Sequence, residues 1–288
     1  MIQEIVSGIS IGCIYAMCGL GFVLIYNAVG AVNFAYGEMV MFGGYFGYLA
    51  TSTFGLPLAL GFVFSILAMS ILGLFNNYFA YYPIKNRPIV TIIIASIGMS
   101  ILLRNSALIG WGPDPLKIGS FMGSGVYDFG SFVIPKHQIL VFIITPMVFI
   151  GQFIFFSRTS IGRKLEATAQ DQEAAKLMGI KVNHMIALTF ILSGILASIA
   201  GFLVAPLWFI EPDIGLYLIV KAFIAIVIGG FGSIPGLIVA AIFLGITEVM
   251  VASHLTSEYK DVISFLILII VLLVLPQGFF GEKIAEKV

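Results

Sequence analysis

The sequence predicts an all-α polytopic membrane protein with about eight or nine transmembrane helices. Of its 288 residues, 60% are hydrophobic and only 10% are charged, whereas a soluble domain carries roughly 25% charged residues. Apolar stretches of about 20 residues, the length of a helix that spans a bilayer, recur along the whole chain. The strands of a membrane barrel would instead alternate over about ten residues. We therefore expect one transmembrane domain over residues 1–288.

Nine apolar stretches define the expected spans. They cover, in order, residues 5–29, 32–51, 56–82, 89–109, 137–156, 184–207, 216–231, 234–252 and 262–275. The second, seventh and ninth are short or interrupted by glycine. Such stretches can form broken or re-entrant helices where protein or water covers the open backbone. Eight complete spans result if one of them is re-entrant.

The segment between the fifth and sixth spans, residues 157–183, differs from the rest of the chain. It holds five of the 14 Lys and Arg residues. Residues 162–178 are rich in good helix formers, and Gly179 follows where a helix end favours glycine. Leu165, Ala169, Ala174, Ala175, Leu177 and Met178 would form one apolar face. We expect a single amphipathic helix with water on one side, although a plain solvated loop is the simpler alternative.

The distribution of basic residues predicts the orientation of the chain. If residues 157–183 are cytoplasmic, nine basic residues lie inside, as the positive-inside rule requires. They are Lys85, Arg87, Arg158, Arg163, Lys164, Lys176, Lys181, Lys283 and Lys287. Lys117, Lys136 and Lys260 fall outside, together with most of the acids. We therefore expect a periplasmic N-terminus and a cytoplasmic C-terminus.

An internal repeat is a further hypothesis. Nine spans make the first four and the last four run in opposite directions, as in transporters built from inverted repeats. Ser7-Gly8-Ile9 recurs as Ser193-Gly194-Ile195, and Gly43-Gly44 recurs as Gly229-Gly230, both at an offset of 186. Few other positions match at this offset.

Four charged residues fall inside apolar stretches, where charges are costly and point to function. They are Glu38, Arg104, Lys221 and Glu248. We expect Arg104 and Lys221 to extend along their apolar stems to a membrane interface. Glu38, with Asn33 close by in the sequence, is the candidate for a translocation pathway. It could line a polar cavity, form an ion pair within the membrane or lie at the cytoplasmic mouth.

Two glycine pairs, Gly43-Gly44 and Gly229-Gly230, are also candidates for the translocation pathway. The second begins the run GGFGSIPG at residues 229–236, which interrupts the helical backbone within an apolar region. Close helix packing is the stronger explanation of such small residues.

The sequence carries no recognisable catalytic or nucleotide-binding motif. The three histidines stand at separate segment ends, and no G-x-x-x-x-G-K-[ST] element occurs. We expect no catalytic residue, no metal site and no cofactor bound by this chain. Active transport would then draw its energy from a partner protein or from an ion gradient.

Seven stretches, in order and almost end to end, carry a family resemblance. They read NFAYGE (33–38), ASIGMS (95–100), RTSIGRKLEATAQD (158–171), LMGI (177–180), KAF (221–223), GGFGSIPG (229–236) and TSEYKDVISFLILIIVLLVLPQGFFG (256–281). Together they closely resemble the LivHM family, the inner-membrane permeases of branched-chain amino acid ABC importers. Residues 173–179 also match E-A-A-x-x-x-G, which resembles the cytoplasmic coupling motif of ABC importer permeases. The Ile-x-Leu-Pro that ends the longer form of this motif is absent.

The resemblance implies a bacterial inner-membrane permease that moves leucine, isoleucine and valine by alternating access. The implied partners are a second, LivM-like permease, two LivG/LivF-like ATPase subunits that use ATP and Mg, and a periplasmic amino-acid-binding protein. The coupling helix would meet the ATPases through Arg163, Glu166, Asp171, Glu173, Ala174, Ala175 and Gly179.

Three alternatives remain. Related permeases of this kind carry urea or other neutral amino acids. A stand-alone, ion-coupled secondary transporter would need an intramembrane ion site, for which Glu38 and Glu248 are the plausible pair. A purely structural membrane subunit is the third.

Overall fold

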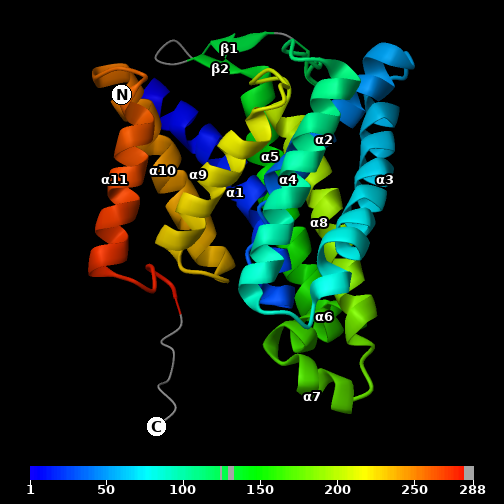
Figure 1. Ribbon diagram of the computed structural model, residues 1–288. Helices are drawn as coiled ribbons and strands as arrows, with labels where there is room; N and C mark the ends of the chain where they lie inside the picture. Colours follow the sequence, from blue (N-terminus) through cyan, green and yellow to red (C-terminus); the bar gives the residue numbers. More distant parts are fainter. Residues whose placement is uncertain (124, 129–132, 282–288) are drawn as a thin grey trace.

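A bundle of helices forms the body of the protein, and small elements cover its two ends (Figure 1). The computed structural model describes residues 1–123, 125–128 and 133–281. Lys283 and Lys287, which the orientation argument places in the cytoplasm, lie outside the described residues. The expectation of an all-α polytopic membrane protein is confirmed.

Six helical segments among the described residues are long and apolar enough to cross a bilayer. They are α1 (Ile2–Val29), the continuous segment Leu58–Ile84, α4 (Ile89–Trp111), α5 (Lys136–Arg158), α8 (Val182–Val204) and α10 (Ile234–His254). The segment Leu58–Ile84 comprises α3 (Leu58–Asn76), a π-helical turn η2 (Asn77–Tyr81) and a 3-10 turn η3 (Tyr82–Ile84). Shorter helices complete the body: α2 (Tyr36–Tyr48), extended by a π-helical turn η1 (Leu49–Thr53), α9 (Ile214–Gly229) and α11 (Tyr259–Val274).

Two opposite faces of the bundle are easily told apart. A two-stranded antiparallel hairpin, β1 (Val126–Asp128) and β2 (Val133–Pro135), lies over one end, next to the start of α1. The backbone N–H of Val133 donates to Gln3 Oε1 at 2.8 Å. Two short helices, α6 (Ser160–Gln170) and α7 (Gln172–Leu177), project from the other end (Figure 1). We call these ends the hairpin face and the α6–α7 face.

Burial separates inner helices from outer ones. Seventeen of the 28 residues of α1 are buried, but only three of the 23 residues of α5 are. The outer helices α3, α4, α5 and α11 expose leucine, isoleucine and phenylalanine side chains, including Leu67, Ile94, Phe153 and Leu273. An apolar outer surface of this kind suits the hydrocarbon core of a bilayer.

The helices α1–α4 and α8–α11 are arranged as an inverted repeat. Helix α1 runs from the hairpin face to the α6–α7 face and packs on α10, whereas α8 runs in the opposite direction and packs on α3. Gly8 and Gly194, one of the glycine pairs related by the offset of 186, lie at these two crossings. A side chain at Gly8 would collide with the backbone of Ile246 in α10, and one at Gly194 would collide with the backbone of Met69 in α3.

The short helices α2 and α9 begin inside the bundle. Asn33 Oδ1 accepts a hydrogen bond from the Ala35 N–H at 3.0 Å, which turns the chain into α2. The first turns of α2 and α9 cross so closely that a side chain at Gly37 would collide with the backbone of Gly215. These two short helices lie in the second and seventh expected spans, two of the three stretches that the sequence left open as broken or re-entrant.

The glycine-rich run at residues 229–236 forms a tight turn between α9 and α10. Gly230 and Gly232 adopt positive φ angles of 104° and 84°, which side chains disfavour. The C-terminal segment crosses this turn, since the N–H groups of Phe279 and Phe280 donate to the carbonyls of Ile228 and Gly229 at 2.9 Å. Close packing of backbone against backbone explains why glycines occur here.

Candidate functional site

The segment that projects from the α6–α7 face is two helices, not the single helix expected over residues 162–178. The chain is extended at Asp171, with φ −155° and ψ 111°. Its carboxylate accepts hydrogen bonds from the N–H groups of Glu173 at 2.8 Å and Ala174 at 3.0 Å. Aspartate favours this N-cap position over a helix interior because its short side chain satisfies free backbone donors. The single-helix prediction is therefore wrong at Asp171.

The same contacts set the charge of this cap. Hydrogen bonds from the backbone N–H of Ala174 and then of Glu173 lower the pKa of Asp171 from its usual value, because they stabilise the ionised carboxylate. At the other end of α7, Gly179 has a φ of 80° and its N–H bonds the Lys176 carbonyl at 3.0 Å. Glycine at this position is a common way to end a helix.

The expected continuous apolar face of this segment is also divided. Leu165 and Ala175 are buried against the bundle, and Gln172 Nε2 donates to the Ala28 carbonyl at the end of α1 at 2.9 Å. In contrast, Leu177 is 90% exposed and Met178 is 79% exposed. The break at Asp171 turns these two apolar side chains toward solvent. The remaining expected coupling residues, Arg163, Glu166, Glu173 and Ala174, are exposed as well.

The second candidate, Glu38, lies deep inside the bundle. Only 1% of its surface is exposed, and Ser100 Oγ donates to Glu38 Oε1 at 3.1 Å. Ser100 is the twelfth of the 23 residues of α4, so Glu38 lies near the middle of that span. The structure therefore places Glu38 at mid-depth in the bundle and not at either of its ends.

A polar cavity lies one helical turn from Glu38, toward the hairpin face. It has a volume of about 300 Å³, and its lining includes Arg104, Asn105, Glu211 and Asp213. Arg104, four residues after Ser100 on α4, forms an ion pair with Asp213. We expected Arg104 to extend to a membrane interface and did not predict this ion pair, because Asp213 lies 109 residues away in the sequence.

The other expected pathway residues serve packing or turns in this structure. Asn33 caps the turn into α2. Gly43 faces the backbone of Ala197 and Ser198 in α8, and Gly44 faces Ile210. Gly229 and Gly230 lie in the turn beneath the C-terminal segment.

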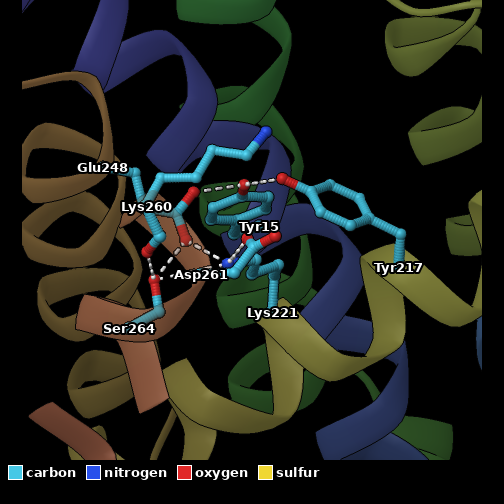
Figure 2. A network of polar contacts seen from close by, with 7 residues as sticks. All are labelled: Tyr15, Tyr217, Lys221, Glu248, Lys260, Asp261 and Ser264. Atoms are coloured by element: carbon cyan, nitrogen blue, oxygen red, sulfur yellow. Dashed lines mark hydrogen bonds and ion pairs between the residues drawn. The ribbon is translucent and has the colours of Figure 1, made fainter. Parts of the chain in front are cut away.

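A third group of polar residues, largely missed by the sequence analysis, surrounds Lys221 (Figure 2). Lys221 is 2% exposed and forms ion pairs at 2.6 Å with Glu248 Oε1 and with Asp261 Oδ1. Ser264 Oγ and Tyr15 OH donate to the Glu248 carboxylate at 2.6 and 2.7 Å. The prediction that Lys221 reaches an interface is wrong, because carboxylates from α10 and α11 neutralise it inside the protein.

We call Tyr15, Lys221, Glu248, Asp261 and Ser264 the ionic cluster. It joins α1, α9, α10 and α11. Sequence signals for it exist on three of these helices. Lys221 and Glu248 are charges inside the apolar stretches of α9 and α10, and Asp261 and Ser264, three residues apart, place polar groups on one side of the otherwise apolar α11. Tyr15 lies in an unbroken apolar stretch and gave no signal.

The described residues do not join Glu38 to Glu248. Glu38 is bonded to Ser100, whereas Glu248 belongs to the ionic cluster. Within the same part of the chain, no three His, Cys, Asp or Glu side chains come close enough to hold a metal ion.

Comparisons with known proteins agree with this architecture. The family model described as "Branched-chain amino acid transport system / permease component" matches residues 4–272. The chain is 36% identical to the high-affinity branched-chain amino acid transport system permease protein LivH of Escherichia coli, covering 100% of this chain and 97% of that protein. It is 35% identical to BraD of Pseudomonas aeruginosa, whose name gives the same function, over 100% of this chain and 98% of BraD.

A solved structure shares the fold at low sequence identity. The structure titled "PsaBC from Streptococcus pneumoniae in complex with Fab" superimposes with a TM-score of 0.50 and 17% identity, covering 96% of this chain and 92% of the other.

Proposed function

Because the chain belongs to the family of branched-chain amino acid transport permeases, we propose that it is the permease subunit of an ATP-binding cassette importer for leucine, isoleucine and valine. The observation that carries this proposal is the full-length match to LivH and BraD, joined to a multi-pass helical bundle. The chain is a transport subunit, and ATP with Mg is used by separate partner subunits.

The proposal gives each face a partner. The α6–α7 face is cytoplasmic and the hairpin face is periplasmic, in the bacterial inner membrane. A periplasmic binding protein delivers the amino acid to the hairpin face. A second, LivM-like permease lies beside this chain in the membrane, and two LivG/LivF-like ATPase subunits lie below.

The helices α6 and α7 are the proposed coupling element. Leu177 and Met178 offer an exposed apolar tip, and the same segment exposes charges of both signs at Arg163, Glu166, Glu173 and Lys176. Exposed apolar side chains with a polar rim are typical of protein interfaces. Differential contact of this tip with two states of the ATPases supplies the free energy that drives alternating access.

Glu38 and the adjoining polar cavity are the proposed pathway element. A carboxylate near the middle of a membrane span is costly to maintain and is a functional candidate for that reason. The pair of permeases would rock about their interface and expose this region to each side in turn.

A reconstituted transporter tests the proposal. Liposomes that contain this chain, its partner permease and both ATPases should take up leucine when ATP and the loaded binding protein are present. Glu173→Arg should abolish most uptake while ATP hydrolysis and folding persist, because the Glu173 side chain is exposed and has no ion pair among the described residues. Lys181→Gln, an exposed change in the same segment, should behave as the parent. Uptake driven by an ion gradient with this chain alone would contradict the proposal.

A further inference from the structure

A second cavity opens on the hairpin face, beside the ionic cluster. Its volume is about 530 Å³, and it extends down to Tyr15, which is the fourteenth of the 28 residues of α1. Pockets that bind small molecules usually measure about 300–1,000 Å³. The cavity is therefore large enough for an amino acid and reaches the middle of the longest buried helix.

The walls of this cavity are aromatic and aliphatic. Trp208 and Tyr217 meet edge to face, with ring centroids 6.2 Å apart, and Tyr15 stacks against Trp208 at 6.4 Å. The helices α1 and α10 add aliphatic side chains, including Ile11 and Val249. Such walls favour an apolar side chain over a charged one.

The polar groups at the floor of the cavity already have partners. Glu248 lines it, but its carboxylate is bonded to Lys221, Ser264 and Tyr15. Tyr15 and Tyr217 also share a hydrogen bond of 3.2 Å between their hydroxyl groups (Figure 2). The floor therefore presents polar groups that already have partners within the protein.

Two opposite charges at the cavity are left without ion-pair partners among the described residues. Lys260 has no ion pair among the described residues; its Nζ lies over the ring of Tyr217, 5.4 Å from the centroid, and Figure 2 shows its ammonium pointing away from Glu248. Glu211 lines this cavity as well as the cavity at Arg104, and the described residues offer its carboxylate no cation within ion-pair distance. A zwitterion supplies the missing partner for each of these groups.

We infer that this cavity is a binding site for the zwitterion of an apolar α-amino acid. Lys260 binds the carboxylate, Glu211 binds the ammonium group, and Trp208 and Tyr217 contact the branched side chain. This inference rests on the proposed function and adds to it a substrate site within this chain, on the side where the binding protein delivers its cargo.

Direct binding to the full-length chain in lipid nanodiscs tests the inference. The chain has two tryptophans, so Trp111→Phe leaves Trp208 as the fluorescent reporter inside the cavity. L-leucine should change this fluorescence in a saturable manner. Leucinamide, which lacks the carboxylate, and 4-methylpentanoate, which lacks the amine, should each bind about tenfold more weakly, as expected for the loss of one charged hydrogen bond.

The role of Lys260 is tested by a variant that should lose the preference for leucine over leucinamide. Lys260→Gln should weaken leucine binding about tenfold and leave leucinamide binding unchanged, so that the two ligands bind alike. Lys136→Gln removes a positive charge from the hairpin face outside the cavity and should match the parent. Because Lys260 has no ion pair among the described residues to lose, the melting temperature of the variant should not fall.

Two outcomes would overturn the inference. One is that the isolated chain gives no saturable fluorescence signal although the same chain transports leucine once it is assembled with its partners. That result would leave the proposed function intact. The other is a Lys260→Gln variant that still prefers leucine to leucinamide. Failure of the assembled wild-type complex to transport leucine would instead contradict the proposed function.

Discussion

At the scale of single residues, the ionic cluster shows how a bilayer protein can keep charges in its interior. Burying a lone ammonium or carboxylate is very costly, and only a partner with good geometry offsets that cost. Lys221 has two carboxylates at 2.6 Å, and Glu248 has three donors in all. Each buried charge is thus satisfied by groups from other helices.

Removing one member of this cluster should therefore be worse than removing two. Lys221→Met should destabilise the protein by about 3–5 kcal/mol, the cost of leaving a buried ion without its partner. The double variant Lys221→Met with Glu248→Gln should recover part of this loss. Thermal unfolding in detergent measures both effects, and a single variant as stable as the parent would show that the cluster contributes no stability.

Glu38 gives a second prediction at this scale. Glu38→Gln keeps a side chain of the same shape that can still accept from Ser100, so stability should change by less than about 1 kcal/mol. Leucine uptake by the reconstituted complex should fall if the carboxylate charge serves the pathway. Full uptake by a stably folded Glu38→Gln variant would assign Glu38 to structure alone.

At the scale of helices, glycines fix how the two halves of the inverted repeat cross. Gly8 and Gly194 occupy equivalent crossings, where a side chain would meet the backbone of α10 or α3. Without a hydrophobic driving force between helices in lipid, close approach of backbones is a main source of helix association. The two positions therefore carry the same small residue for the same reason.

A leucine should destabilise the protein at a glycine that is packed at a helix crossing, but not at a glycine on the outer surface of the bundle. Gly194→Leu should destabilise the bundle by at least about 1–3 kcal/mol, the usual cost of overpacking. Gly98→Leu on α4 is the matched control, because a side chain there would meet no atom within 4 Å. Size-exclusion profiles after heating should show early loss of the Gly194 variant alone. Equal melting of both variants would count against a tight α3–α8 crossing.

At the scale of the whole molecule, the two faces predict a definite orientation. Cys13 and Cys18 are buried, so they form a silent background for labelling with an impermeant maleimide. Val126→Cys in β1 should be labelled in cells whose outer membrane alone is permeable. Leu177→Cys at the tip of α7 should be labelled only after the inner membrane is opened. The reverse pattern would invert the proposed topology.

The sequence by itself determined the class of the protein and the approximate spans, because these follow from local hydropathy. The inverted repeat is only a hypothesis at that level, and the packing of α1 on α10 and of α8 on α3 supports it. The sequence also located the projecting segment through its composition. It did not reveal the break at Asp171, because good helix formers lie on both sides of this residue, and an aspartate can either face solvent within a helix or cap a new one until the backbone donors that it meets are known.

The tertiary structure alone decided which charges meet. Lys221, Glu248 and Asp261 lie on three helices, and Arg104 finds Asp213 across the bundle. Hydropathy records each of these residues as an isolated cost, since the energy of a buried charge depends on partners that are distant in the chain. The cavity that joins Lys260 to Glu211 exists for the same reason: folding brings together side chains that no sequence interval relates.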